Sequence, residues 1–288
     1  MTALAIGLAL AAAAIHGTWN VLVKVSGDPM RTFRRGTVIA AVVITPITLV
    51  AWLYAGRPSL TLAAVGLAAL SALFELAYLV LLSAAYNRGE LSVVYPIARG
   101  SAPLLSVAAG LGLIGERLTP GQMAGVGLLL LGILAVTLPQ TSGRATVPAL
   151  LTGVSIAAYS AVDRIGVRLS TPWLYGWLLI CLLAVGVVIW GWATARFAAS
   201  SPKATERQEG PPVRWPQATV IGLLMWGGYL LVLAALSIAP LSVVAPVRET
   251  AIVAVAVWGV WKLGERKGAV LKLLGATATL VGVALLAF

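Results

Sequence analysis

Leu91-Ser92-Val93-Val94-Tyr95-Pro96 occurs a second time, with one substitution, as Leu241-Ser242-Val243-Val244-Ala245-Pro246. The tripeptide Gly115-Glu116-Arg117 likewise recurs as Gly264-Glu265-Arg266, again about 150 residues downstream. A spacing that holds for two separate motifs indicates that the chain contains an internal repeat. We expect a first repeat at residues 1–140 and a second at residues 146–288, the second with a polar linker at residues 200–215.

The composition of the chain is that of a membrane protein. Hydrophobic residues make up 60% of the 288 residues, and charged residues only 10%. A soluble domain carries about 25% charged residues, so there is too little polar surface here to cover a water-soluble globule. The apolar residues gather in blocks of about 20, the length of a helix that crosses a bilayer. They lack the polar–apolar alternation of a membrane β-barrel, so we predict an all-α integral membrane protein.

Ten apolar blocks, most of them bounded by glycine or proline, predict ten transmembrane helices. The expected helices cover residues 2–24, 36–55, 60–86, 91–114, 121–138, 147–167, 173–195, 217–237, 241–262 and 268–287. Each half of the chain then contains five spans. An odd number of spans forces equivalent helices to cross in opposite directions, which gives two inverted repeats.

The distribution of basic residues predicts the orientation of the chain. Of its 20 Lys and Arg residues, 14 lie in or beside the loops that follow the odd-numbered helices, and 3 lie at the opposite face. Basic loops stay in the cytoplasm, so this bias places both termini outside the cell. The same anchoring role accounts for the net charge of +11, and we therefore expect no nucleic acid partner.

Three motifs resemble EamA-type members of the drug/metabolite transporter superfamily, in particular a subgroup of bacterial members. They are His16-Gly17-Thr18-Trp19-Asn20, Tyr95-Pro96-Ile97-Ala98-Arg99-Gly100 and Ala245-Pro246-Val247-Arg248-Glu249-Thr250. The resemblance covers essentially the whole chain. It implies ten helices in two inverted repeats around a central cavity, working by alternating access, but no particular substrate. Many such relatives are expected to have cytoplasmic termini, whereas the charge count here places the termini outside.

Arg99, Arg248 and Glu249 are charged residues inside expected spans, where an unpaired charge is costly and therefore marks a functional site. Alignment through the two prolines makes Glu249 the counterpart of Arg99, with Arg248 beside it. Two guanidinium groups could hold a carboxylate, phosphonate or phosphate group of a substrate. The alternative is an Arg–Glu lock between the halves, without substrate contact. Tyr95 shares a helix face with Arg99 and is expected to offer a hydrogen bond in the cavity.

Pro96 and Pro246 lie one turn into their expected helices, where proline frees a backbone carbonyl. Transporters expose backbone groups to substrate at such kinked helices, so a gating role is one interpretation and a simple helix-entry proline the other. The Gly-Glu-Arg ends are expected to terminate spans at the membrane interface, where the glutamate pairs with a basic group.

His16, Trp19 and Asn20 belong to the first expected helix, with His16 and Asn20 on one stripe. They could contact substrate, and His16 could relay protons. The alternative is an interhelical hydrogen bond. Asp163, which aligns with Asn20, is a candidate proton-coupling carboxylate or the partner of an arginine. Glu75, midway through the third span, is a further candidate.

These observations predict a secondary transporter for a small polar metabolite, anionic or zwitterionic, in the cell's inner membrane. The expected partners are this solute, the lipid bilayer and protons, with the protein a monomer or homodimer and without cofactor or metal. The alternatives are a membrane-embedded enzyme and a non-transporting scaffold. The enzyme is disfavoured because the chain has one His and one Cys, Cys181, and no cluster with metal-ligand spacing. The scaffold is disfavoured because it has no need for buried charges.

Overall fold

The computed structural model describes residues 2–89, 91–137, 144–199, 214–251 and 269–287. Within these ranges the chain is all helix and turn, without a strand. The helices are α1 (Thr2–Lys24), α2 (Pro29–Tyr54), α3 (Leu62–Tyr86), α4 (Leu91–Gly112), α5 (Pro120–Thr137), α6 (Thr146–Gly166), α7 (Pro172–Ala199), α8 (Trp215–Ile238), α9 (Leu241–Arg248) and α11 (Ala269–Ala287). Nearly all of the expected linker 200–215 and the second Gly-Glu-Arg at 264–266 lie outside the described residues.

Six of these helices, α1, α2, α3, α6, α7 and α8, are long and apolar enough to cross a membrane. Large apolar side chains on α2, such as Val42, Ile47 and Val50, are exposed, as expected of a helix that faces lipid. The prediction of an all-helical, multi-pass membrane protein is confirmed. The full count of ten crossings and the inverted relation of the halves stay predictions.

Helix α2 begins at Pro29, seven residues before the expected start at residue 36. Asp28 caps the helix, because its carboxylate accepts a hydrogen bond from the backbone N–H of Arg31 at 2.9 Å. Proline is well suited to the first helical position, where its missing N–H costs nothing. The expectation of a late start was wrong because the basic residues of this segment belong to the first turns of the helix.

Helix α9 ends at Arg248, so the expected continuous span from residue 241 is interrupted at Glu249 and Thr250. Pro246 lies inside the helix and donates no backbone hydrogen bond. Two tighter bonds close the helix, from Glu249 N to Pro246 O at 3.1 Å and from Thr250 N to Val247 O at 3.2 Å. The part of the expected span beyond residue 251 lies outside the described residues.

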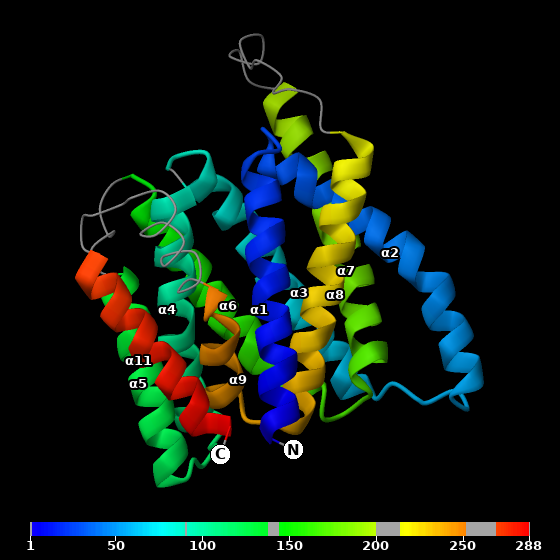
Figure 1. The fold of residues 1–288 in the computed structure, drawn as a ribbon. Coiled ribbons are helices and arrows are strands. Elements are labelled where there is room, and N and C mark those ends of the chain that lie inside the picture. The colour runs from blue at the N-terminus through cyan, green and yellow to red at the C-terminus, as the bar shows by residue number, and fades with distance from the viewer. Residues whose placement is uncertain (1, 90, 138–143, 200–213, 252–268, 288) are drawn as a thin grey trace.

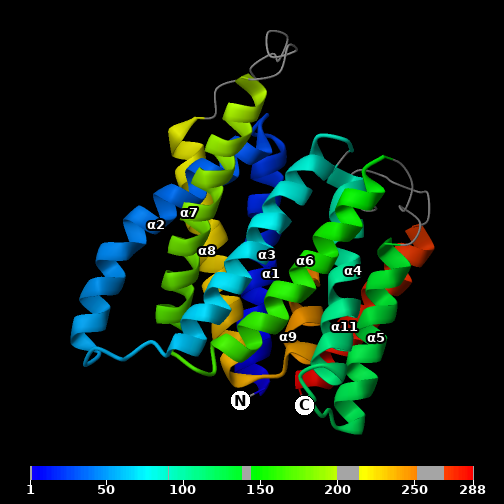
Figure 2. The ribbon, with the colours of Figure 1, turned by 180° about the vertical axis from the view of Figure 1, so that it is seen from behind.

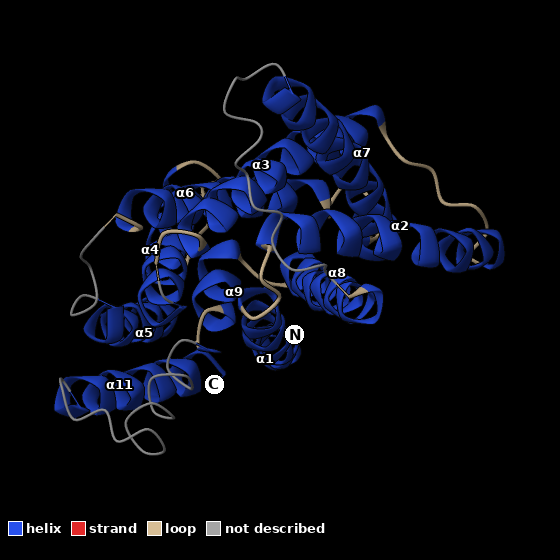
Figure 3. Cartoon of the chain, turned by 90° about the horizontal axis from the view of Figure 1, so that it is seen from above, coloured by secondary structure: helices blue, strands red, loops and turns tan. Residues whose placement is uncertain are grey.

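The helices form one bundle in which the N- and C-terminal ends lie at the same end (Figures 1 and 2). Seen along the bundle, α5 and α11 lie together at one edge and α2 lies at the opposite edge (Figure 3). The most extensive contacts join α5 with α11, α3 with α6, α4 with α6, and α1 with α8. The short helix α9 packs against α4 and α1 in the interior.

Several contacts between helices of the two halves occur in equivalent pairs. Helix α3 packs against α6, and its equivalent α8 packs against α1. Likewise α4 packs against α6 while α9 packs against α1, and α2 packs against α8 while α7 packs against α3. Each of these contacts thus has a counterpart made by the equivalent helices of the other half.

Close backbone approach holds α5 against α11. A Cβ atom on Gly125 would lie 3.0 Å from the carbonyl oxygen of Gly282, so neither position has room for a side chain. Helices α2 and α8 approach in the same way at Gly36 and Gly222. In a bilayer such small residues stabilise helix pairs, because lipid gives helices no hydrophobic reason to associate.

Candidate functional site

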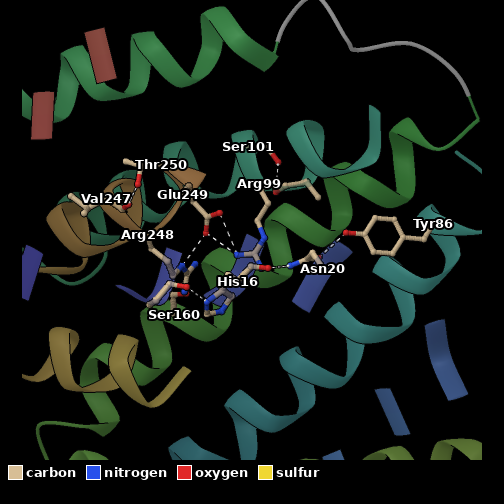
Figure 4. Close-up of polar contacts among 12 residues, drawn as sticks. His16, Asn20, Tyr86, Arg99, Ser101, Ser160, Val247, Arg248, Glu249 and Thr250 are labelled. Atoms are coloured by element: carbon tan, nitrogen blue, oxygen red, sulfur yellow. Dashed lines mark hydrogen bonds and ion pairs between the residues drawn. The ribbon is translucent and has the colours of Figure 1, made fainter. Parts of the chain in front are cut away.

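Arg99 and Glu249 form a buried ion pair between the two halves of the chain (Figure 4). Arg99 on α4 places its Nη1 atom 3.1 Å from Oε1 and 3.3 Å from Oε2 of Glu249. Arg248, the last residue of α9, places its Nε atom 2.9 Å from the same Oε1 atom. The residues are 2%, 1% and 1% exposed, respectively, so all three charges are removed from solvent. These contacts match the lock alternative, and the cluster contains one guanidinium group more than it has carboxylates.

The end of α9 positions this charge cluster. Glu249 caps the helix at its C-terminus, and Thr250 Oγ1 donates to Val247 O at 2.8 Å in the following turn. Glu249 and Arg248 therefore occupy adjacent positions at a helix end, a place where a cation is favourable. Arg248 also donates from Nη1 to Ser160 Oγ on α6 at 3.3 Å (Figure 4).

The polar residues of α1 lie beside the cluster. The guanidinium carbon of Arg99 lies 5.9 Å from the centre of the Trp19 ring, and the rings of Trp19 and His16 are 5.7 Å apart. His16 Nδ1 bonds to Ala12 O of its own helix at 2.8 Å. This bond is therefore not the interhelical hydrogen bond that the sequence suggested as an alternative to substrate contact. Asn20 does make an interhelical bond, because Tyr86 on α3 donates its hydroxyl to Asn20 Oδ1 at 2.7 Å.

Asp163 is fully buried on α6 and is held by two tyrosine hydroxyls. Tyr175 on α7 donates to Oδ1 at 2.7 Å, and Tyr229 on α8 donates to Oδ2. The ion pairs of the described residues include none from Asp163 to an arginine, so the partner in this structure is hydroxyl rather than guanidinium.

A cavity lies next to the charge cluster and is lined by residues of α1, α2, α3, α6, α7 and α8. Three of the expected site residues, His16, Trp19 and Glu75, line it, whereas Arg99, Arg248 and Asn20 lie outside the lining. Four buried donors of the lining have no hydrogen-bond partner among the described residues. They are Trp19 Nε1, Thr37 Oγ1, Tyr78 OH and Trp226 Nε1.

Three tyrosines form one wall of the cavity. Tyr78 on α3 and Tyr159 on α6 are edge to face with ring centres 5.9 Å apart, and Tyr159 and Tyr229 on α8 are 5.6 Å apart. The sequence analysis did not include these tyrosines in the site. Tyr78 and Tyr229 occupy equivalent positions in the internal repeat, and this equivalence could have identified them.

Glu116, of the first Gly-Glu-Arg, does more than end a span. Its carboxylate accepts from the backbone N–H groups of Leu241 and Ser242, at 2.7 and 2.9 Å, and from Ser242 Oγ at 2.7 Å. Arg164 on α6 pairs with the same carboxylate at 3.1 Å. A residue of the first half thus caps the N-terminus of α9 in the second half, and the expected pairing of this glutamate with a basic group is present.

Lys24 and Arg164 hold equivalent helix ends in the two halves. Lys24 Nζ donates to the carbonyls of Tyr86 and Gly89 at 2.6 and 2.8 Å, after α3. Arg164 donates to the carbonyl of Leu236 near the end of α8, and Leu236 lies 150 residues after Tyr86. Cations are favourable at the C-terminal ends of helices, where unpaired carbonyls gather.

Two of the expected site residues, Tyr95 and Pro96, have side chains outside the described part of the structure; the backbone of α4 is helical through both. Pro246 is buried inside α9, two residues before the end of that helix.

Comparisons with known proteins agree with the resemblance seen in the sequence. The model of the EamA-like transporter family matches residues 3–138, which is the first half of the chain. No curated protein matches the chain. One solved crystal structure is 17% identical, with a TM-score of 0.68 over 99% of this chain and 98% of that chain, which shows a shared fold. Over residues 3–138, the chain thus matches the EamA-like transporter family, which lies within the drug/metabolite transporter superfamily of membrane transporters.

Proposed function

We propose that the protein is a secondary transporter that moves a small anionic or zwitterionic metabolite across the cell's inner membrane by alternating access. The observation that carries this proposal is the cavity beside the Arg99–Glu249–Arg248 cluster, with its four unpartnered donors. A buried donor without an acceptor costs about 1–3 kcal/mol, so such groups call for a partner. Oxygen atoms of a bound solute are suitable acceptors.

The helix arrangement supports alternating access. Several contacts between the two halves occur in pairs: a helix of the first half packs against one of the second, and the two equivalent helices also pack together. Such paired contacts are expected of two inverted repeats around a shared site. Arg99 comes from one half and Glu249 from the other, so a movement of the halves changes their separation. A solute carboxylate that takes over one guanidinium would then compete with Glu249 and weaken the contact between the halves.

Protons are our proposed coupling ion, with Asp163 as the group that carries them. The Asp163 side chain is fully buried and accepts hydrogen bonds from the hydroxyls of Tyr175 and Tyr229, and no described ion pair joins it to an arginine. A carboxyl without an arginine partner can lose or gain a proton without breaking an ion pair. Ionisable groups of this kind inside spans commonly form proton relays.

Flux through purified protein in liposomes tests the proposal. A metabolite panel is first screened for thermal stabilisation, because a ligand that binds the folded state raises its stability. The strongest binder is then assayed for exchange across the membrane and for uptake driven by a pH gradient. We expect saturable exchange in the wild type, and in Asp163→Asn we expect exchange to persist while gradient-driven uptake is lost.

The control for the aspartate variant is Asp28→Asn, which keeps a capping oxygen at the surface end of α2. It should behave as the wild type in both assays. Gradient-driven uptake by Asp163→Asn would contradict proton coupling through this residue. Conversion of the bound metabolite to a product without net flux would contradict the transporter function itself and favour an enzyme.

A further inference from the structure

Glu75 lies in the cavity wall without a described partner. It is 8% exposed, midway along α3, and lines the cavity. None of the described residues shares a hydrogen bond or an ion pair with its carboxyl. The other buried acids differ: Glu249 pairs with two arginines, Asp163 bonds to two tyrosine hydroxyls, and Glu116 pairs with Arg164.

Among the described buried charged residues, carboxyl groups outnumber guanidinium groups by one. The buried charged residues that the structure describes comprise two guanidinium groups, Arg99 and Arg248, and three carboxyl groups, Glu75, Asp163 and Glu249. Charges inside a membrane protein are costly unless they are balanced, so the third carboxyl requires a proton or a positively charged ligand. A purely anionic solute would increase this imbalance.

The walls around Glu75 are suited to a cation. Tyr78 follows one turn later on the same face of α3, and Tyr159 and Tyr229 continue the row of rings across α6 and α8. Aromatic rings attract ammonium groups electrostatically, and the attraction is strongest where water is excluded. A carboxylate and several rings in one desolvated cavity form the usual combination for binding an organic cation.

The remainder of the cavity can accept the other parts of a small solute. Leu79, Leu179 and Leu233 give it an apolar lining, suited to an aliphatic body. Trp19 lines the cavity and its ring lies against the guanidinium of Arg99; its indole N–H, which can only donate and has no described partner, is suited to an oxygen of the solute.

We propose that Glu75, with Tyr78, Tyr159 and Tyr229, forms a subsite for an ammonium group of the transported solute. The inference rests on the proposed transport function and changes its substrate class: zwitterionic solutes stay, simple anions are excluded, and cationic solutes are added. The carboxyl of Glu75 then holds either a proton or the ammonium group of the solute, and the solute's carboxylate, where it has one, points towards Arg99 and Arg248.

Three probes that share one aliphatic body separate the charge requirements. They are isopentylamine, leucine and 4-methylpentanoate, which are a cation, a zwitterion and an anion of matched shape. Apparent affinities are measured at neutral pH by the concentration dependence of thermal stabilisation of the purified protein. We expect the amine and leucine to bind, and Glu75→Gln to weaken both at least tenfold without weakening 4-methylpentanoate.

A second substitution keeps the test valid if Glu75→Gln folds poorly. Tyr159→Leu removes one ring face, and it should weaken isopentylamine about fivefold, the value of one cation–π contact. The matched control is Tyr54→Leu, which removes a tyrosine that is 91% exposed at the end of α2 and should change nothing. Unchanged amine affinity in both cavity variants would overturn the proposal, as would a wild type that binds neither amine-bearing probe.

The outcomes distinguish this inference from the transport function. Binding and exchange of 4-methylpentanoate alone would overturn the ammonium subsite and leave the transporter intact. Binding of the amines that depends on Glu75, without any flux in liposomes, would support the subsite and contradict the transporter.

Discussion

Arg99 Nη1 lies 3.1 Å from Glu249 Oε1, although the two residues are 150 positions apart in the chain. Equivalent positions of the internal repeat therefore meet in the interior of the bundle. One carries a cation and the other an anion, so the repeat has diverged at the point where the halves touch. An ion pair at this place joins the halves, and in the proposed transport cycle it is the contact that a charged solute would displace.

The first prediction concerns the strength of this contact. In a double-mutant cycle of Arg99→Gln and Glu249→Gln, the two substitutions should be strongly non-additive, with a coupling of about 1–3 kcal/mol. The reason is that each single variant leaves a buried charge with fewer partners, whereas the double variant removes one charge of each sign. Unfolding midpoints of the purified protein measure the effect. Additive changes would show that the pair contributes nothing to the contact between the halves.

The second prediction concerns Glu116 as an anchor for α9. Glu116→Ala removes three hydrogen bonds to the start of α9 and leaves the largely buried Arg164 without its ion pair. We expect a loss of about 3–5 kcal/mol in stability, as for other broken buried pairs, and a smaller loss for Glu116→Gln, which keeps one acceptor oxygen. Thermal unfolding is the measurement. Arg117→Gln, at the exposed neighbouring residue, is the control and should lie within about 0.5 kcal/mol of the wild type.

The third prediction tests the packing of α5 against α11. Gly125→Ala would place a Cβ atom 3.0 Å from the Gly282 carbonyl, whereas a Cβ atom on Gly127 would meet nothing within 4 Å. We expect Gly125→Ala to destabilise the protein by about 1–3 kcal/mol through overpacking. Gly127→Ala, in the same helix, should be neutral or stabilising because alanine favours helix. Equal midpoints for the two variants would contradict this close approach.

The fourth prediction tests the orientation of the chain. The count of basic residues places the loop between α2 and α3 outside the cell and the loop between α3 and α4 in the cytoplasm. With Cys181 replaced by Ser, a cysteine at exposed Ser59 should react with a membrane-impermeant maleimide in intact cells, and one at exposed Asn87 should react only after lysis. The reverse pattern would mean that the termini are cytoplasmic, as expected for many relatives.

The sequence predicted the helices well because each one is a local property of the chain. Apolar runs and their Gly or Pro boundaries place most helix ends within a few residues of the observed ones. The start of α2 was missed because Asp28 and Pro29 form a helix start of the soluble type ahead of the apolar run. The interruption of α9 at Glu249 was missed because an apolar run resumes in the sequence directly after Arg248, Glu249 and Thr250.

The candidate site was predictable where the repeat relates its residues, and also where a polar residue lies inside an expected span, as at His16 and Glu75. The offset of 150 residues paired Arg99 with Glu249, and the structure brings these two together with Arg248. The anchor of Glu116 to α9 joins elements 125 residues apart that the repeat does not align, so its partners could not be read from the chain. The tyrosine wall was missed although the repeat aligns Tyr78 with Tyr229, because its three helices come together only in the tertiary fold.

Solute exchange in liposomes by the wild type, Arg99→Gln and Arg248→Gln tests the central claim most directly, with Arg117→Gln as a control of the same chemistry at the exposed surface. The solute is the strongest binder from the thermal screen, and the amount of folded protein inserted in each preparation is matched. The account predicts saturable exchange by the wild type and the control, and its loss in both cluster variants despite normal insertion. Normal exchange by both Arg99→Gln and Arg248→Gln would contradict a transport site at the contact between the halves.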